Sequence, residues 1–448
     1  MKSFINYVKV TMNNNFLKPL WHYTDPDPYN RITSMHLELT NKCNAGCPMC
    51  PRYENYGAKL NENLVLDEIT IDKFKNWFLP DFVKGLKKVY SCGNYGDPIV
   101  AADTLLIYKY LRETNPNLTL QIFTNASART TSWWAELGTI INSGLKGRGD
   151  HVTFSVDGLA DTNHLYRRNT FFEKIKENME AFINAGGIAH WDFIVFKHNE
   201  HQVEEAKQLA KEMGFENFNV KKTTRWTKDR YFEVWGPNNQ PLYKLEAPEN
   251  PLYNDTTLQE LKKKIKTEEQ PANFLKNINY NANLKALFEM KADEYSKYIT
   301  YRSEKVLANT IELEPRCIHF SRKGRIDNNE IFVTANGYVY PCCFLGGEND
   351  KPGEPELKDS VLKMIDLQGG LDSINLNVNS LESVVSSSLY KDWLVDSFEL
   401  GNVMRSVQCT ECCGKEWDKL SYGEMGDRGS GYFNEDSQKI INDKFGKK

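Results

Sequence analysis

The chain has 448 residues, of which 40% are hydrophobic and 12% aromatic, enough to bury substantial cores and to exclude wholesale disorder. This length indicates two or three domains. The formal net charge is -4, with acidic and basic residues interspersed, which argues against a dedicated nucleic-acid-binding protein because such proteins present a broad basic face.

No targeting segment is evident. Residues 1–20 contain no apolar core of signal-peptide length, because lysine and asparagine interrupt the stretch repeatedly. No other stretch approaches the run of about 20 apolar residues that spans a bilayer. We therefore expect a cytoplasmic protein without membrane contact, whose ten cysteines are metal ligands or catalytic thiols rather than disulfides.

Between Met35 and Lys222, short strand-like runs alternate with amphipathic helical stretches. The predicted strands are residues 35–40, 87–92, 118–124, 151–156, 190–197 and 215–222, with helices at 69–78, 102–114, 130–144, 169–187 and 200–214. Six β–α units in tandem predict an α/β fold with a parallel sheet and right-handed crossovers. Periodicity alone leaves open whether the sheet is doubly wound or a partial barrel.

The strand–helix rhythm stops after this region. Residues 223–310 are interpreted as an insertion, either a lid over the active site or a spacer, with helices near 257–266 and 282–298. Residues 330–343 predict a hairpin around Asn336-Gly337, the pair favoured in a type I′ turn, and a helix follows at 381–398. The predicted boundaries divide the chain into an extension, a strand–helix domain, the insertion, a cysteine-bearing domain and a tail: 1–34, 35–222, 223–310, 311–430 and 431–448.

A cluster of basic residues follows the last predicted strand. It consists of Lys221, Lys222, Arg225, Lys228 and Arg230. We interpret it as a solvated strand end and loop, with contact to a polyanion as the alternative.

Three cysteines follow the first predicted strand. Cys43, Cys47 and Cys50 have the spacing C-x3-C-x2-C on a short loop, so their thiolates can converge on three irons of one cubane cluster. No fourth cysteine lies nearby, which leaves one iron open for a small molecule, as at catalytic metals generally. A zinc site would want a fourth Cys or His in the loop, and a redox-active C-x2-C pair would leave Cys43 unexplained.

The motif, placed after the first strand of a series of β–α units, resembles the hallmark of the radical S-adenosylmethionine (SAM) superfamily. The sequence CPMCPR resembles that of superfamily members that carry a C-terminal auxiliary-cluster domain. This resemblance implies a partial (β/α)6 TIM-like barrel rather than an open sheet. It also implies a [4Fe-4S] cluster that binds SAM, and an electron donor such as flavodoxin or ferredoxin.

Segments at the ends of the predicted strands resemble the SAM-binding elements of the same superfamily. GNYGDP (93–98) is similar to its Gly-Gly-Glu-Pro turn, with Asp97 replacing the usual glutamate. FSVDG (154–158), TNA (124–126) and FKHN (196–199) resemble its later strand ends, and Met49 stands where an aromatic residue commonly packs on adenine. The resemblance thus implies cofactor contacts at Met49, Gly93, Gly96, Asp97, Pro98, Ser155, Asp157 and Asn199.

Six further cysteines lie in the C-terminal region. The layout C…G-x4-C…C-x2-C, with Gly337 five positions before Cys342, is similar to the single-cluster "twitch" form of the SPASM domain. That resemblance implies a second, auxiliary [4Fe-4S] cluster, with adjacent spare thiols. The implied ligands are Cys317, Cys342, Cys409 and Cys412, and the spare thiols are Cys343 and Cys413. A swap within either adjacent pair, and a four-thiolate structural zinc, stay open.

The implied activity is that of an oxidoreductase. It cleaves SAM reductively to a 5′-deoxyadenosyl radical, which abstracts a hydrogen atom from a peptide or protein side chain or from a small alcohol. Cys92, at the end of the second strand, is interpreted as a buried thiol, with a hydrogen-donor role as the alternative. The competing functions are a nucleotide- or tRNA-modifying radical enzyme, suggested by the basic cluster, and a zinc-stabilised binding protein without turnover.

Overall fold

The computed structural model describes residues 28–144, 149–223, 225–226, 229–250, 253, 329–346, 360–398, 409 and 431–432. The helices predicted at 257–266 and 282–298, most of the N-terminal extension, and Cys317, Cys412 and Cys413 lie outside these residues. In the part of the chain that is described, no helix is long and apolar enough to cross a membrane.

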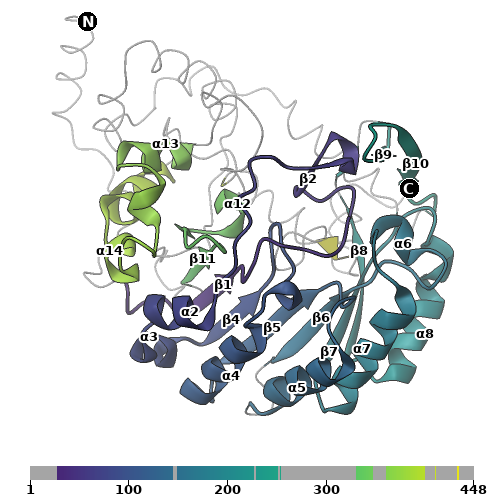
Figure 1. Cartoon of the computed structure of the whole chain (residues 1–448), viewed down its shortest axis with the longest axis horizontal. Helices are drawn as coiled ribbons and strands as arrows, with labels where there is room; N and C mark the ends of the chain where they lie inside the picture. The colour runs from purple at the N-terminus through teal and green to yellow at the C-terminus, as the bar shows by residue number, and fades with distance from the viewer. Residues whose placement is uncertain are drawn as a thin grey trace, which may run out of the picture.

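A nine-stranded sheet in the order β12-β11-β1-β4-β5-β6-β7-β8-β13 forms the centre of the structure (Figure 1). Six consecutive neighbours, all parallel, are β1 (Ser34–Leu37), β4 (Lys88–Ser91), β5 (Thr119–Thr124), β6 (His151–Ser155), β7 (Ala189–Ile194) and β8 (Asn217–Lys222). They coincide with the six predicted strands. The predicted α/β fold with a parallel sheet is therefore confirmed, in the form of a partial TIM-like barrel followed by a C-terminal region.

Helices fill the crossovers between these strands. They are α2 (Ile71–Trp77), α3 (Pro80–Gly85), α4 (Thr104–Thr114), α5 (Thr131–Asn142), α6 (Asn163–Tyr166), α7 (Phe172–Asn184) and α8 (Val203–Met213). Thr70 and Thr130 cap two of them by accepting from the backbone N–H three residues on, at 3.2 and 3.3 Å. Gly214, with φ 88°, ends α8 in the left-handed conformation that glycine adopts without strain.

Side chains alternate between the two faces of the sheet. Val89, Ile122 and Trp191 are fully buried on the outer face, where α4, α5, α7 and α8 cover the strands (Figure 1). The alternate positions carry polar side chains such as His36 and Asp192, which are also buried. The interior of the partial barrel therefore carries buried polar side chains beside aromatic ones such as Tyr90 and Phe332, unlike the apolar layer beneath the helices.

The C-terminal region adds a hairpin to this sheet. β11 (Glu330–Val333) runs parallel to β1, and β12 (Val339–Tyr340) pairs antiparallel with β11. The predicted hairpin is confirmed, but its type I′ turn is wrong. Gly337 has φ 89°, whereas Asn336 is not at positive φ, and the Gly337 N–H donates to the Thr334 carbonyl at 2.9 Å. A turn over residues 334–337 that ends in a left-handed glycine replaces it.

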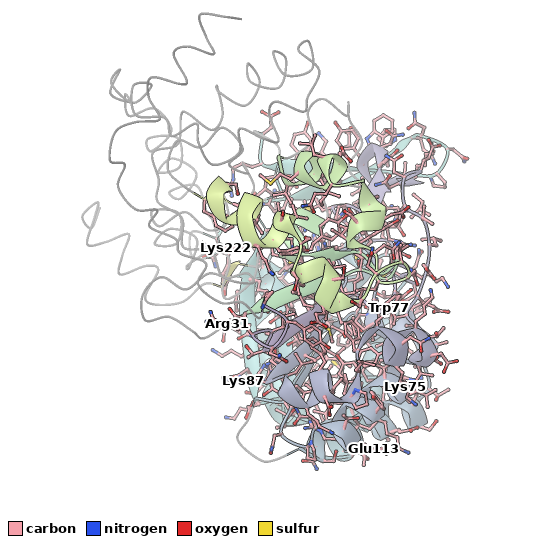
Figure 2. The ribbon with its side chains drawn as sticks, turned by 90° about the vertical axis from the view of Figure 1, so that its left-hand side faces the viewer. Arg31, Lys75, Trp77, Lys87, Glu113 and Lys222 are labelled. Atoms are coloured by element: carbon pink, nitrogen blue, oxygen red, sulfur yellow. The ribbon has the colours of Figure 1, made fainter. Side chains whose placement is uncertain are left out.

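Short helices follow the hairpin: α12 (Cys343–Gly346), α13 (Ser360–Leu367), α14 (Leu381–Val385) and α15 (Leu394–Ser397). The helix predicted at 381–398 is interrupted, because three serines at 386–388 favour local turns over helix and a π-helical turn occupies Leu389–Trp393. The break lets the Tyr390 hydroxyl donate to the Val339 carbonyl at 2.7 Å. In Figure 2 these segments lie above α2 and α4, which carry Lys75 and Glu113.

Two small antiparallel pairs stand apart from the main sheet. β2 (Tyr53–Glu54) pairs with β3 (Lys59–Leu60) directly after the cysteine loop, and β9 (Tyr231–Trp235) pairs with β10 (Pro241–Glu246) after β8. At the far edge of the main sheet, β13 (Gly431–Tyr432) pairs antiparallel with β8. The region interpreted as an insertion therefore begins with a hairpin that the sequence analysis did not identify.

Candidate active site at the carboxyl ends of the barrel strands

The three cysteines of the C-x3-C-x2-C motif lie on the loop that follows β1, and none forms a disulfide. Burial, followed by the charges of Asp97 and Cys47, raises the pKa of the Cys43 thiol well above its ordinary value. Burial also raises the pKa of Cys47 to about 11, with Arg167 opposing the shift and Cys50 adding to it. The thiols are thus near enough to influence one another, and they ionise together readily only around a cation.

This donor set fits an iron–sulfur cluster better than a single ion. Among the described residues, no three His, Cys, Asp or Glu side chains lie close enough to hold one metal ion. A cubane cluster presents a different iron to each thiolate, so its three ligands surround it without converging on a point. Three neighbouring free thiols packed against one apolar cluster meet that requirement.

Two N–H donors point at the cysteine sulfurs. Asn125, after β5, places Nδ2 3.8 Å from Cys43 Sγ, and Arg167, after α6, places Nη1 3.7 Å from Cys47 Sγ. Such donors stabilise thiolate rather than thiol. Arg167 was missed in the sequence analysis. Its only sequence signal is a basic residue ten positions after Asp157.

The turn at residues 93–98 lies directly against the cysteine loop. A Cβ at Gly96 would stand 1.7 Å from the Thr40 carbonyl oxygen, and a Cβ at Gly93 would stand 2.0 Å from the Gly96 carbonyl oxygen. The Asp97 N–H donates to the Lys42 carbonyl at 3.0 Å. Both glycines are therefore required by close backbone approach, and the turn fixes the start of the loop.

A buried glutamate holds the same turn from the barrel interior. Glu38, immediately after β1, is 2% exposed and accepts from the backbone N–H groups of Tyr95 at 2.7 Å and Gly96 at 3.3 Å. Glu38 was not among the site residues predicted from the sequence. The alternation of Ser34, His36 and Glu38 on the inward face of a strand was the available signal.

Asp97 and Pro98 complete the turn. Asp97 Oδ2 accepts from the Asn125 N–H at 2.7 Å and Oδ1 from the Ile99 N–H at 3.2 Å, while burial raises the pKa of this carboxyl. Pro98 is buried at the start of a short 3-10 helix, Pro98–Val100. The Asp97 side chain thus joins the ends of β4 and β5, and the predicted cofactor contact at this turn rests on its backbone.

The ends of β6 and β7 are tied together by two further predicted site residues. Asp157 Oδ1 accepts from the Ile194 N–H at 2.6 Å, and Oδ2 accepts from Arg167 Nε at 2.6 Å. Asn199 Nδ2 donates to the carbonyls of Asp157 and Ile194, both at 2.9 Å. Burial raises the pKa of Asp157 against the lowering effect of Arg167. Ser155, the last residue of β6, lies beside Asp192 in the strand register. A cofactor contact by any of these side chains remains a prediction.

The β9–β10 hairpin covers the cysteine loop. Val234 and Leu245, at most 1% exposed, form one apolar cluster with Cys47, Met49 and Tyr166. Met49 is itself buried, and its carbonyl accepts from Arg225 Nη1 at 2.9 Å. This apolar shell limits water at the three thiols, and it belongs to the region that the sequence analysis interpreted as a lid or a spacer.

A buried ion pair lies in the barrel interior. Lys221 on β8 pairs with Asp192 on β7, with side chains 6% and 4% exposed, and Asn219 Nδ2 donates to Asp192 Oδ1 at 2.9 Å. The interpretation of Lys221 as part of a solvated strand end is therefore wrong, because its position alternates with the outward-facing Val220. The half-buried Cys92 lies near this pair, and burial raises the pKa of its thiol to about 12 against the opposing charge of Lys221.

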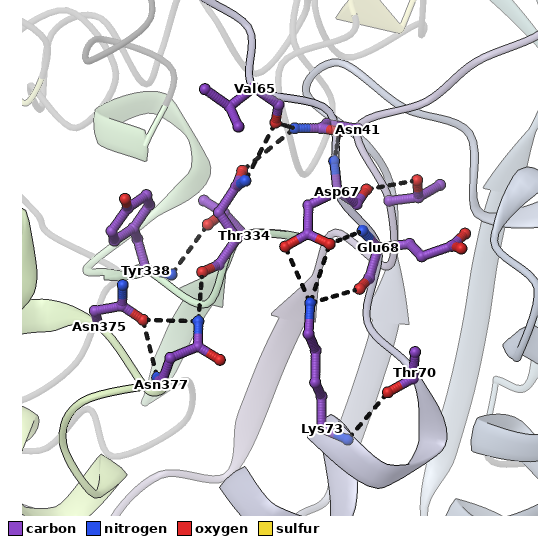
Figure 3. A network of polar contacts seen from close by, with 12 residues as sticks. Asn41, Val65, Asp67, Glu68, Thr70, Lys73, Thr334, Tyr338, Asn375 and Asn377 are labelled. Carbon is purple, nitrogen blue, oxygen red and sulfur yellow. Dashed lines mark hydrogen bonds and ion pairs between the residues drawn. The ribbon is translucent and has the colours of Figure 1, made fainter.

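A network of polar contacts joins the start of the cysteine loop to the C-terminal hairpin (Figure 3). Asn41 Nδ2 donates to the Val65 carbonyl at 2.6 Å and to Asn336 Oδ1 at 3.3 Å. Asn336 Nδ2 donates to the same carbonyl at 3.1 Å. The Asp67 N–H donates to Asn41 Oδ1 at 2.7 Å, and Lys73 pairs with the Asp67 carboxylate at 3.0 Å. The hairpin turn therefore helps to fix the segment just before the first cysteine.

Three cysteines of the C-terminal region are described. Cys342 and Cys343 are half-buried at the start of α12, and Cys409 is buried in the main core, 7% exposed. Asn94, in the turn at 93–98, donates Nδ2 to the Cys343 carbonyl at 2.7 Å. This hydrogen bond links the turn beside the first cysteine group to the segment that carries Cys342 and Cys343, and the choice of auxiliary ligands remains a prediction.

Comparison with known proteins identifies the domain. The sequence model of the radical SAM superfamily matches residues 37–217, which contain the cysteine loop and the turn at 93–98. No curated protein sequence matches the chain. Streptococcus suis SuiB bound to S-adenosylmethionine is similar at 14% identity and TM-score 0.41, covering 91% of this chain and 81% of that one. Native anSMEcpe with bound AdoMet is similar at 14% identity and TM-score 0.43, covering 92% and 96%. Residues 37–217 therefore form a radical SAM domain, and the protein that carries it is a radical SAM enzyme.

Proposed function

We propose that this protein is a two-cluster radical SAM oxidoreductase that removes a hydrogen atom from a peptide or protein side chain or from a small alcohol. The observation that carries the proposal is the hydrogen bond from Asn94 to the Cys343 carbonyl. It joins the turn expected to bind SAM to the segment that carries the second group of thiols. The radical site and the auxiliary site would then border one space at the carboxyl ends of the strands, where ligands bind in barrels.

When bound, the first cluster and SAM supply one electron and a 5′-deoxyadenosyl radical. The protein's own residues hold and shield this site. Cys43, Cys47 and Cys50 provide three ligands, and the turn at 93–98 presents its backbone beside them. The β9–β10 hairpin excludes water, which protects a reactive species from side reactions.

The barrel interior suits a polar substrate. Its inward side chains near the strand ends include the Asp192–Lys221 pair and Asn219, which supply charges and hydrogen-bonding groups in a sparsely hydrated space. These groups already satisfy one another, so they would give a hydroxyl or a peptide group a polar surrounding rather than free partners. Loss of a hydrogen atom, then of an electron to the auxiliary cluster and of a proton, would oxidise such a substrate by two electrons.

The basic cluster does not support a nucleic-acid substrate. Lys221 is committed to Asp192, and Arg225 donates to the Met49 carbonyl. Burial of Lys221 against Asp192 removes one of the exposed charges on which a tRNA-modifying function would depend. A zinc-stabilised binding protein without turnover is not retained, since the chain is a radical SAM enzyme.

The test is the iron and sulfide content, with EPR spectra, of anaerobically reconstituted wild type and of a Cys43→Ala/Cys47→Ala/Cys50→Ala variant. We expect about eight irons in the wild type and about four in the variant, with 5′-deoxyadenosine formed only by the wild type. The matched control is Cys92→Ala, which lies in the barrel but outside both ligand sets and should keep about eight irons.

About four irons in the wild type and almost none in the triple variant would remove the auxiliary cluster and leave the radical site standing. The electron-accepting role would then be wrong, and zinc analysis of the C-terminal thiols would follow. With two clusters present, candidate peptides and alcohols are compared by substrate-dependent 5′-deoxyadenosine formation.

A further inference from the structure

We propose that Arg167 is a positioning residue that sets the reduction potential of the cluster held by Cys43, Cys47 and Cys50, by donating an N–H to the Cys47 sulfur. The inference rests on the cluster's place at these cysteines and not on the auxiliary cluster. Arg167 Nη1 lies 3.7 Å from Cys47 Sγ, and Nε lies 2.6 Å from Asp157 Oδ2. One edge of the guanidinium is thus held by a carboxylate while another donor faces the sulfur.

Arg167 is held both at its backbone and at its guanidinium. The Arg167 N–H donates to the Asn163 carbonyl at 2.8 Å at the end of α6, and the Thr170 hydroxyl donates to the Arg167 carbonyl at 2.6 Å. The guanidinium carbon lies 5.3 Å from the ring centre of Tyr166. With its side chain 17% exposed, Arg167 has little freedom to turn away from the sulfur.

The anchor of Arg167 is rigid as well. The Asp157 side chain is 0% exposed, and its second oxygen accepts from the Ile194 N–H at 2.6 Å. A carboxylate held from the backbone of the next strand cannot follow a displaced arginine. The Asp157–Arg167 pair therefore connects the ends of β6 and β7 to the cysteine loop. Its geometry determines where the Arg167 N–H lies relative to the Cys47 sulfur.

Reduction adds one negative charge to the cluster and its thiolates. A positive group and an N–H donor near a ligand sulfur stabilise that reduced form, and hydrogen bonds to the sulfurs are among the factors that set cluster potentials. The effect is strengthened in a site shielded by the β9–β10 hairpin, because the local dielectric constant is low. Removing the donor should move the potential in the negative direction.

The experiment compares the midpoint potential of the SAM-responsive EPR signal in wild type, Arg167→Gln, Arg167→Lys and Arg168→Gln, each with iron and sulfide determined. Arg168 is the matched control, because its Nη1 donates to the Gly57 and Trp235 carbonyls at 3.4 Å rather than to a cysteine. At the midpoint potential of the wild type, the Arg167→Gln protein should contain about tenfold less reduced than oxidised cluster. This ratio corresponds to a shift of the midpoint potential by 59 mV in the negative direction for one electron. Arg167→Lys should shift less, in the same direction, and Arg168→Gln should not shift.

The proposal would be overturned if the Arg167→Gln protein kept its full iron content and its cluster had the same midpoint potential as that of the Arg168→Gln control. If Arg167→Gln fails to retain iron because Asp157 is left buried without its partner, the double variant Arg167→Gln/Asp157→Asn and the Arg167→Lys variant decide the question. A negative shift in either supports the role, and an unchanged potential in both refutes it. A purely structural role would change iron content without changing the potential of the cluster that remains.

Discussion

Gly96→Ala should be among the most damaging single-methyl additions in the barrel. The new Cβ would lie 1.7 Å from the Thr40 oxygen and 2.5 Å from its carbonyl carbon, and both are backbone atoms that cannot rotate away. The turn must then move off the cysteine loop. That costs about 1–3 kcal/mol for overpacking, and roughly 0.5–1.5 kcal/mol for each hydrogen bond lost, such as Glu38 to the Tyr95 N–H. A total of about 3 kcal/mol lowers the melting temperature by roughly 6–12 °C in a domain of this size.

Anaerobic thermal unfolding followed by circular dichroism, with iron content, measures the effect of Gly96→Ala. The control is Gly85→Ala at the end of α3, where no atom lies within 4 Å of the added Cβ and the backbone is not left-handed. It should leave the melting temperature unchanged or raise it slightly. The reasoning would be refuted if Gly96→Ala had the same melting temperature as Gly85→Ala and kept its iron.

Three further variants test other contacts in the structure. Asp192→Asn alone should cost about 3–5 kcal/mol by removing the carboxylate that faces the buried Lys221 ammonium, and Asp192→Leu/Lys221→Met should recover most of it in denaturant unfolding. Burial, followed by the charge of His190, lowers the pKa of His151 to about 4. Neutral His151 therefore contributes its full share of the unfolding free energy above pH 6.5, and this share is lost as the pH falls towards 4. His151→Asn should flatten the dependence of unfolding free energy on pH in that window, and an unaltered slope would contradict the assignment. Asn94→Ala, which removes the bond to the Cys343 carbonyl, should lower the unfolding free energy by about 1 kcal/mol and spare the iron at Cys43.

The sheet could be predicted from the sequence because its signals are local. Strand-like runs such as residues 118–124 are bounded by turn residues, and the intervening helices carry an apolar face and a cap, as at Thr130. The three-cysteine loop is equally local, since its spacing is contained in eight residues. The hairpin at 330–340 was found for the same reason.

The rest depends on contacts between segments distant in sequence. Arg167 and Cys47 are 120 positions apart in sequence, and Asn94 and Cys343 are 249 positions apart. No pattern within any one of these segments can therefore predict the contact. The turn type at Asn336 was mispredicted because pair statistics for a two-residue loop were applied to a longer one. The β9–β10 hairpin did carry a local signal, GPNNQP between two alternating runs, which was overlooked in a stretch interpreted by its composition.

The pairing of β11 with β1 has a consequence for synthesis of the chain. Ser34 and its partner Glu330 are separated by 296 residues, so the outer edge of the first barrel strand stays open until most of the protein has been made. At 5–20 residues per second this interval is roughly 15–60 s. During it, a strand with unpaired backbone groups is available to neighbouring nascent chains. The first strand of the barrel thus gains its second neighbour only late in translation. Until then, its open edge is the part of the barrel that a chaperone would most need to cover.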